Sequence, residues 1–375
     1  MTIVLYRIHV KLTAVKSNEL MVKRHFLILI SIFAIMQSCN TYYSIDDYNK
    51  VPKIDAHIHY SYANPVLLEQ AEKDNFRLIT VNVETGTDPG INQQESVAID
   101  LMSKYKEFIA YLSTFSSEDW ISDNWTDNTI RRINASREKG ASGVKIWKTF
   151  GMQLMDGDSN FVFIDDSKLN PVFRHMAEHD IPLLAHIGEP KNCWLPLDEM
   201  TVENDRSYFA DHPEYHMYLH PEMPSYERIM HARDHVLSKH GNLKVVGAHF
   251  GSIEWDLDSL ASCLDRYPNF AVDMAARIGH MHYHSNKDYE KTRQFFIKYH
   301  DRILYGTDMG TESETATSGE GFHDYWYSDW RYLATDKEFE SKFINQEIKG
   351  LKLPKNIIDD IYFNNSNNWY PGISF

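Results

Sequence analysis

The stretch KIDAHIHY, residues 53–60, joins a short apolar run to two histidines that stand one residue apart. Residues i and i+2 of a β-strand point to the same face, so both imidazoles would leave one side of such a strand. Two imidazoles that converge there can share a metal ion, or they can be surface histidines without a function. The pair alone does not decide between these alternatives, so the rest of the chain has to decide.

Seven further short apolar runs follow at intervals along the chain, each bounded by turn or helix-cap signals. Several of them are apolar at consecutive positions, which is typical of strands that are covered on both faces. With KIDAHI (53–58), the predicted strands are RLITVNV (77–83), FIAYLST (108–114), GVKIW (143–147), IPLLAHI (181–187), LKVVGAH (243–249), NFAVDMA (269–275) and RILYGTD (302–308).

Stretches with helical spacing and cap residues lie between these strands. Gly140 and Gly241 stand where helix C-caps belong, directly before a predicted strand. Eight strands that alternate with helices predict an α/β fold, a single-domain (β/α)8 TIM-like barrel over residues 51–375. An open doubly wound sheet is the alternative, but no glycine-rich phosphate loop follows the first strand. The clearest predicted helices are 64–75, 126–140, 170–180 and 225–241.

Two long segments interrupt the alternation of strands and helices. Residues 188–224 follow the fifth predicted strand, and residues 309–350 follow the eighth. Long loops in compact domains are usually functional or disordered, and the aromatic content of these two argues against disorder. In a barrel both would rise from the C-terminal face, where active sites are built. We therefore expect them to be lids over an active site.

Composition and charge limit the class of partner. The chain has 375 residues, of which 43% are hydrophobic and 24% charged, as in ordinary globular proteins. Its formal net charge of −15 argues against binding to nucleic acid. We expect a small-molecule substrate, and the sequence is compatible with a monomer or a homo-oligomer.

The N-terminal residues do not look like part of the fold. Lys23 and Arg24 precede an apolar run at 26–36 that only Ser31 interrupts, and Met21 offers a second start that would make residues 1–20 a misassigned extension. The run is shorter than the ~20 residues that a bilayer-spanning helix needs. A basic segment followed by a short apolar one predicts a signal peptide.

Cys39 follows this segment directly and resembles the lipidated cysteine of bacterial lipoproteins, although Met36 stands where that motif usually has leucine. The resemblance implies a leader over residues 1–39, a tether over 40–50 and lipidation at Cys39. The chain would then be secreted across the inner membrane as a periplasmic or outer-membrane lipoprotein, attached to the membrane only through this anchor. Secretion without a lipid and an uncleaved anchor are the alternatives.

Residue types that bind metals stand at the C-terminal ends of four predicted strands. His57 and His59 end the first strand, His186 the fifth, His249 the sixth and Asp308 the eighth. Each alone has a simpler explanation, as a buried core histidine or a turn aspartate. The C-terminal strand ends of a barrel meet at one face, so the set together predicts a shared metal site.

The motifs DAHIH (55–59), LLAHIGEP (183–190), VVGAHFG (245–251) and LYGTD (304–308), in this order, resemble the amidohydrolase superfamily of metal-dependent hydrolases. More closely, they resemble its amidohydrolase-related branch, which includes lactonases and non-oxidative decarboxylases. The resemblance covers residues 51–370. It implies a metal, usually zinc, bound by His57, His59, His186 and Asp308, and a substrate- or water-orienting His249.

This ligand set has a consistent chemistry. Three imidazoles and one carboxylate suit Zn²⁺, or another divalent metal such as Mn²⁺, and leave a position for water. A water bound to zinc has a pKa of ~7. Asp308 would take the proton of that water, and His249 would polarise the substrate carbonyl. We therefore expect one metal per chain and hydrolysis of a lactone, ester or amide.

Two other functions remain open at this stage. A decarboxylase of the same family would use the same ligands to bind an acid and release CO2. A non-catalytic lipoprotein would keep the barrel and use the pocket only to bind a ligand. The fold cannot choose among these functions, because function depends on the site.

Three further residues are candidates for substrate binding. Lys145 lies within the fourth predicted strand, and alternation that turns it inward would turn Lys148 away. Lys145 either faces the substrate, has a structural role, or bridges two metals as a carboxylated lysine, which the resemblance implies for some members of the family. Arg277 is placed to bind a substrate carboxylate, or forms a salt bridge at the barrel rim. Glu189 binds substrate or caps its loop.

Two histidine-rich pieces raise the question of a second metal. HPEYHMYLH (212–220) contains a proline that breaks helical register, and HMHYH (280–284) has no evident carboxylate partner. We expect both to be solvated loop histidines.

Overall fold

The computed structural model describes residues 41–86, 88–311, 319–373 and 375. The predicted leader and Cys39 lie outside them. None of the helices within these ranges is long and apolar enough to cross a membrane. Ser44–Phe375 form one compact unit, and Tyr48, in the segment predicted as a tether, is only 3% exposed.

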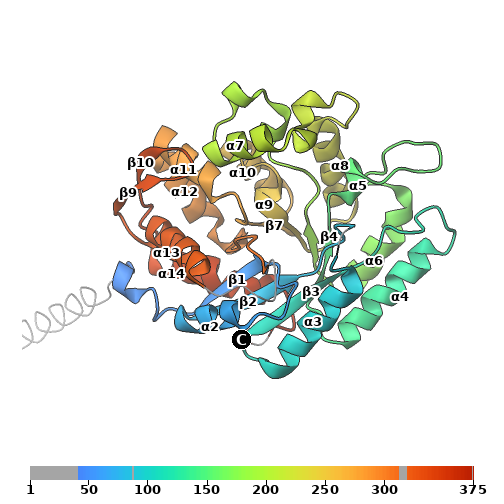
Figure 1. The fold of residues 1–375 in the computed structure, drawn as a ribbon, viewed down its shortest axis with the longest axis horizontal. Coiled ribbons are helices and arrows are strands. Elements are labelled where there is room, and N and C mark those ends of the chain that lie inside the picture. Colours follow the sequence, from blue (N-terminus) through green and yellow to red (C-terminus); the bar gives the residue numbers. More distant parts are fainter. Residues whose placement is uncertain (1–40, 87, 312–318, 374) are drawn as a thin grey trace, which may run out of the picture. The chain divides into compact units, whose positions relative to one another are not determined.

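A barrel of eight parallel strands forms the centre of this unit, and the strands are ordered as in the sequence (Figure 1). The predicted (β/α)8 fold is confirmed. The strands are β1 (Lys53–Ile58), β2 (Phe76–Val81), β3 (Ile109–Thr114), β4 (Gly143–Ile146), β5 (Leu183–Ala185), β6 (Val245–Gly247), β7 (Phe270–Asp273) and β8 (Ile303–Leu304).

The barrel closes along a seam between β1 and the segment that follows β8. The backbone N–H of Asp308 donates to the carbonyl of His57 at 2.8 Å, and that of His59 donates to the carbonyl of Met309 at 2.8 Å. A Cβ at Gly306 would lie 2.9 Å from the Cβ of His57. Glycine is needed at this position because the two chain segments approach so closely.

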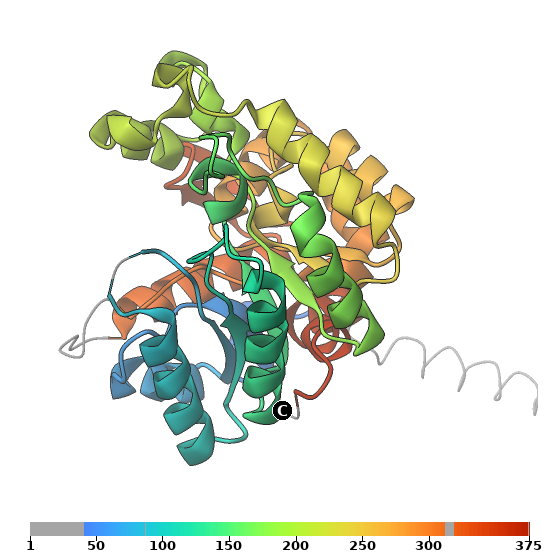
Figure 2. The same ribbon diagram turned by 90° about the vertical axis from the view of Figure 1, so that its right-hand side faces the viewer.

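Helices cover the outside of the strands, and Figure 2 shows several of them running alongside the sheet. Polar caps begin several of them: the side chain of Asn64 accepts from Val66 N, and that of Ser225 accepts from Arg228 N. The α-helices are α2 (Pro65–Lys73), α3 (Ile91–Lys104), α4 (Trp125–Glu138), α5 (Thr149–Met152), α6 (Asn170–Glu178), α7 (Glu203–Asp211), α8 (Tyr226–Lys239), α9 (Ala248–Gly251), α10 (Leu257–Arg266), α11 (Ile278–Lys287), α12 (Tyr289–Tyr299), α13 (Glu320–Ala334), α14 (Lys355–Asp359) and α15 (Asn365–Trp369).

Apolar side chains from most of the strands fill the barrel, as the consecutive apolar positions predict. Ile54, Ile79, Leu112 and Leu184 are fully buried in this cluster, and Tyr370 near the C-terminus packs against it. The polar residues at the strand ends therefore stand on a rigid apolar base.

The two long segments fold into regular elements. Residues 188–224 form α7 and the short helices η3 (Lys191–Trp194), η4 (Leu197–Glu199), η5 (Pro213–Tyr215) and η6 (Met217–Leu219). The second segment contains α13 and an antiparallel hairpin of β9 (Glu338–Ser341) and β10 (Gln346–Lys349), which lies near α11 in Figure 1. The sequence did not predict this hairpin.

The prediction for the histidine-rich pieces is wrong in part. HMHYH lies in α11, where His280 and His282 are 2% and 1% exposed. His280 has a carboxylate partner after all, because its Nε2 lies 3.1 Å from Asp205 Oδ2 of α7. In 212–220, His216 is also buried, with Nε2 2.7 Å from a backbone carbonyl.

Candidate active site

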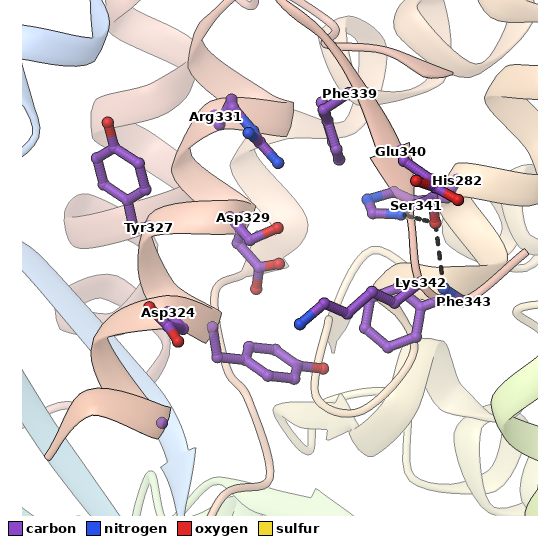
Figure 3. Close-up of a pocket in the computed structure, with 13 residues that line it drawn as sticks. His282, Asp324, Tyr327, Asp329, Arg331, Phe339, Glu340, Ser341, Lys342 and Phe343 are labelled. Atoms are coloured by element: carbon purple, nitrogen blue, oxygen red, sulfur yellow. Dashed lines mark hydrogen bonds between the residues drawn. The ribbon is translucent and has the colours of Figure 1, made fainter. Parts of the chain in front are cut away.

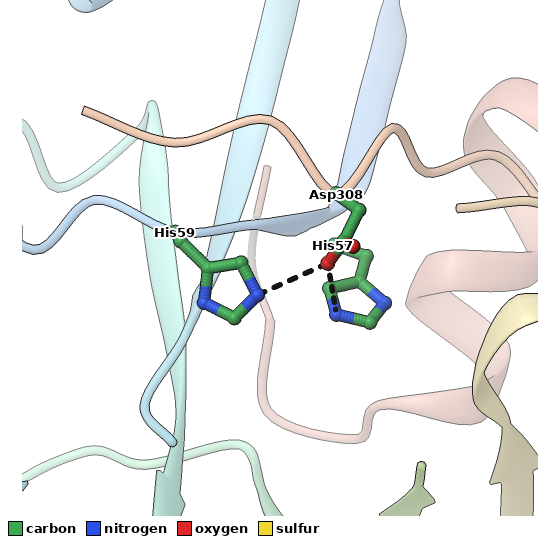
Figure 4. Close-up of side chains that lie close together, drawn as sticks. All are labelled: His57, His59 and Asp308. Carbon is green, nitrogen blue, oxygen red and sulfur yellow. Dashed lines mark hydrogen bonds and ion pairs between the residues drawn. The ribbon is translucent and has the colours of Figure 1, made fainter. Parts of the chain in front are cut away.

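Three side chains converge where the barrel closes. One nitrogen of His57, one of His59 and a carboxylate oxygen of Asp308 all lie within 4.8 Å of one another (Figure 4). Asp308 Oδ1 is 3.2 Å from His57 Nε2 and 3.1 Å from His59 Nε2. Alternation along β1 turns both imidazoles to one side, and the seam brings Asp308, in the segment after β8, between them. These are three of the four predicted metal ligands.

The outer nitrogens of these imidazoles have their own partners. His57 Nδ1 lies 2.7 Å from Oδ2 of Asp273, which is buried at the end of β7. His59 Nδ1 lies 3.1 Å from the carbonyl of Val81. A carboxylate or carbonyl behind a ligand imidazole fixes its orientation, and the carboxylate makes it more basic. Both Nε2 atoms are therefore directed at Asp308.

The protonation states of these groups suit a cation. Burial alone would raise the pKa of Asp308, but the imidazoles of His249, His57 and His59 hold it well below the usual value of 3.8. Burial, and then the charge of Lys145, lower the pKa of His57. A carboxylate and neutral imidazoles are the forms that bind a divalent metal.

His186 and His249 form a second pair beside this cluster. His186 Nδ1 lies 3.1 Å from His249 Nε2, and His249 Nδ1 lies 2.7 Å from the carbonyl of Ala275. The structure does not include His186 in the three-residue cluster. Its Nε2 is buried, however, and has no hydrogen-bond partner in the described parts of the chain. Because a buried unpaired nitrogen is costly, His186 Nε2 is suited to a ligand.

The backbone is strained at two of these positions. His249 has φ 60° and Asp308 has φ 67°, both in the left-handed region. This conformation is uncommon for residues other than glycine and costs of the order of 1–3 kcal/mol when the surroundings impose it. Such strain is concentrated at functional sites, which agrees with the assignment of both residues to the site.

Lys145 touches the cluster directly. It is 1% exposed, and its Nζ lies 2.9 Å from His57 Nε2. Burial lowers its pKa to about 8. The predicted inward orientation is correct, but Lys148 does not face away, because β4 ends at Ile146 and the chain then leaves the strand. Lys148 lines the same cavity as His186 and forms an ion pair with Glu189.

Arg277 precedes α11 and is 8% exposed. Its Nη1 donates to the carbonyl of Ala276 at 3.0 Å, while its Nε has no partner among the residues that the structure describes. Burial opposes its charge, but nearby carboxylates, first Asp205 and then Glu254, raise its pKa. The guanidinium is thus charged and has a buried N–H to offer a carboxylate.

A cavity of about 380 Å³ opens over the site, which is a size that suits a small molecule. Its lining includes His59, Trp147, Lys148, His186 and Asp308. The structure therefore gathers residues from the ends of β1, β4, β5 and β8 around one opening.

The donor set fits a divalent metal. His57 Nε2, His59 Nε2 and Asp308 Oδ1 converge, and Asp273 stands behind one imidazole as metal sites commonly require. The unpaired His186 Nε2 offers a fourth nitrogen. The sequence predicted all four of these candidate ligands but not Asp273, which is a lone carboxylate in an otherwise apolar strand.

Comparison with known proteins supports a family assignment. A family model described as amidohydrolase matches residues 54–371. No curated protein matches the chain.

Several solved structures are similar. An uncharacterised TIM-barrel protein from Bordetella bronchiseptica has 13% identity and a TM-score of 0.49, over 86% of this chain and 99% of that one. A 2,6-dihydroxybenzoate decarboxylase from Rhizobium has 13% identity and a TM-score of 0.49, over 85% and 98%. A probable 2-pyrone-4,6-dicarboxylic acid hydrolase from Acinetobacter baumannii has 12% identity and a TM-score of 0.45, over 85% and 98%.

Proposed function

The chain belongs to the amidohydrolase family and is a metal-dependent enzyme, and from that premise we propose that it hydrolyses a lactone, ester or amide bond in a small substrate that carries a carboxylate. The observation that supports this proposal most is the convergence of His57, His59 and Asp308 beside a cavity that His59 and Asp308 line. These residues, with His186, would hold one divalent metal, zinc or manganese.

A metal held there supplies a Lewis acid and lowers the pKa of a water molecule. Asp308 is then the base that receives the proton of the attacking water, since the imidazoles around it keep it ionised. His249 is 1% exposed and has its Nδ1 held by the Ala275 carbonyl, so its Nε2 side faces His186 and the site. Because Nδ1 carries the ring proton and burial lowers the pKa of His249 to about 3, its Nε2 is an acceptor, which can orient His186 or the attacking water through a hydrogen bond.

Arg277 would bind the substrate carboxylate. Its buried Nε–H has no partner within the described ranges, and a carboxylate accepts such a donor in a short charge-assisted bond. Lys145 would add a second positive charge beside the cluster. Glu189 would act indirectly, by holding Lys148 at the cavity wall.

A product analysis on the metal-loaded protein tests the proposal. Lactones, aryl esters, amides and aromatic carboxylic acids are offered in H2¹⁸O, and products are examined by mass spectrometry for one added ¹⁸O or for loss of CO2. Hydrolysis gives a carboxylate that carries the label. Loss of CO2 without label would instead assign the decarboxylase reaction, and an inert protein with one bound metal would favour a ligand-binding role.

We also propose that the chain is exported and anchored through a lipid on Cys39. The basic and apolar segment before this cysteine supports the proposal. Metabolic labelling of a bacterial host with an alkyne fatty acid should mark the wild-type chain and leave Cys39→Ser unmarked. Equal labelling of both would refute the anchor.

A further inference from the structure

A second cavity, of about 460 Å³, lies between α13 and β9, next to α11. None of the residues that line it lines the cavity over His59 and Asp308. Figure 3 shows His282 and Ser341 on one side and the side chains of Asp329 and Arg331, from α13, on the other. Phe339 and Phe343 complete its wall, so the cavity combines polar groups with aromatic surface.

His282 is a buried nitrogen donor at this cavity. Its Nδ1 lies 2.8 Å from the hydroxyl of Ser341, and that hydroxyl accepts from Phe343 N at 3.3 Å. We therefore assign the Ser341 hydroxyl as the donor and His282 Nδ1 as the acceptor. The proton of the neutral imidazole then lies on Nε2. Nε2 has no partner among the described residues, and the ring is 1% exposed and points into the cavity (Figure 3).

Arg331 brings a second unused donor. Its Nε is buried and lacks a hydrogen-bond partner in the described part of the chain. The guanidinium carbon lies 4.1 Å from the ring centroid of Phe339, so the aromatic face holds the charged group in place. Its charge also lowers the pKa of His282, after burial as the larger cause, and this keeps the imidazole neutral.

The acidic residues of the cavity do not cancel this charge. Asp329 is 2% exposed, and burial raises its pKa to about 8, so it is mainly protonated at neutral pH. Asp324 and Glu340 are exposed at the mouth, where Lys342 is exposed as well. The buried end therefore has one positive guanidinium and two unsatisfied N–H groups.

We propose that this cavity is a second binding site, for a small aromatic carboxylate. A carboxylate is an acceptor with two oxygens, so it can satisfy the N–H groups of His282 and Arg331 together. The ring of the ligand would pack against Phe339 and Phe343, which favour flat apolar groups. The site does not depend on the proposed hydrolysis and lies outside the cavity over the metal ligands.

Benzoate is the probe for the test, titrated calorimetrically into the full-length, metal-loaded chain. We expect saturable binding that Arg277→Gln leaves in place, because Arg277 does not line this cavity and is the carboxylate-binding residue proposed for the metal site. Arg331→Gln should weaken this binding at least tenfold. Arg228→Gln is the matched control, since its guanidinium also lies over a phenylalanine ring, at 3.7 Å from Phe163, but neither residue lines this cavity. It should bind benzoate like wild type.

A second measurement follows benzoate binding in the wild-type chain, with every side chain of the cavity intact. With ¹⁵N-labelled histidine, the Nε2 resonance of His282, assigned by its absence in His282→Asn, should shift as benzoate is added to the wild-type chain. The proposal is overturned if benzoate does not bind, if Arg277→Gln removes all binding, or if Arg331→Gln binds as tightly as wild type while the His282 signal stays still.

Discussion

His57 and His282 are both buried imidazoles whose Nδ1 atom has a hydrogen-bond partner, yet we assign them opposite roles: His57 would bind a cation and His282 an anion. Behind His57 stands the carboxylate of Asp273, 2.7 Å from Nδ1. Behind His282 stands the hydroxyl of Ser341, 2.8 Å from Nδ1. A carboxylate makes the ring a stronger base and turns its free nitrogen toward a cation, whereas a hydroxyl that donates leaves the free nitrogen as an N–H for an anion.

Asp308 and Asp329, the carboxyl groups of the two regions, have pKa values shifted in opposite directions. The imidazoles around Asp308 hold its pKa well below 3.8, so it is ionised and can help to bind a metal. Among the residues that the structure describes, no cation is in hydrogen-bond contact with Asp329. It accepts from the hydroxyl of Tyr305, and burial raises its pKa to about 8. The groups in contact with an imidazole or carboxylate thus determine whether it can bind a cation or an anion.

The largest effect should come from removing the charge at the first site. Asp308→Asn keeps the shape of the side chain but loses its charge and its ability to accept a proton. We expect turnover to fall by about 10³-fold or more, in the range of general acid–base and electrostatic contributions. Steady-state kinetics on the substrate found in the product analysis, with metal content measured in parallel, check this. Asp324→Asn, at an exposed position, should keep wild-type turnover. An Asp308→Asn variant with wild-type turnover would show that Asp308 is not the base.

Replacing the group behind His57 should have the next largest effect. Asp273→Asn offers His57 a neutral amide in place of a carboxylate, so the ring becomes a weaker ligand. We expect the dissociation constant for zinc to rise about 10- to 100-fold, as for other residues that support metal ligands. Competition with a chromophoric chelator measures it. Ser341→Ala, which changes the group behind His282, should bind zinc like wild type; equal losses in both variants would contradict the comparison.

Asp329 should make stability depend on pH in a definite direction. Its pKa is about 8 in the folded chain and about 3.9 when unfolded. Between these values the folded state holds the extra proton, so stability falls as pH rises, by up to about 1.4 kcal/mol per pH unit. Asp329→Asn lacks this titration and keeps an oxygen for Tyr305.

Urea unfolding of both proteins from pH 5 to pH 8 measures the difference between their unfolding free energies. The stability of wild type relative to Asp329→Asn should decline across this range. Burial lowers the pKa of Lys53 to about 7 and raises that of Asp55 to about 6, but both groups are present in both proteins. Parallel stability curves would show that Asp329 is ionised, and would weaken the case for an anion beside it.

The smallest effect should come from the hydroxyl behind His282. Ser341→Ala removes the donor that places the ring proton on Nε2, but the ring and Arg331 remain. We expect benzoate to bind roughly fivefold more weakly, which corresponds to about 1 kcal/mol, the typical contribution of one hydrogen bond. Calorimetry against wild type checks this. Unchanged affinity would mean that Ser341 does not set the state of His282.

The fold was predictable because its signal is local. Each of the eight strands is a short apolar run between turn or cap residues, so the residues within a few positions were enough to predict it. The residues at the strand ends were predictable for the same reason, since the barrel brings all C-terminal strand ends to one face. His57, His59 and Asp308 needed no further information.

Other parts of the site depend on contacts that no local pattern contains. Asp273 is 216 positions from His57, and only the closed barrel puts the two within hydrogen-bond distance. His280 and His282 were predicted as solvated because the residues that bury them, on α7, α13 and β9, are distant in sequence. Lys148 could not be placed by alternation, because alternation ends where β4 ends.

The seam between β1 and the segment after β8 has a consequence for the order of events during folding. His59 and Asp308 are 249 positions apart, so the metal site cannot exist until almost the whole chain has been synthesised and the last strand has docked on the first. Contacts of such long range are slow to form. An ion that binds only the closed barrel would stabilise it by about 4 kcal/mol at 1,000 times its dissociation constant. Metal uptake should therefore accompany the final step of folding, and the bound ion should slow the reopening of the closed barrel.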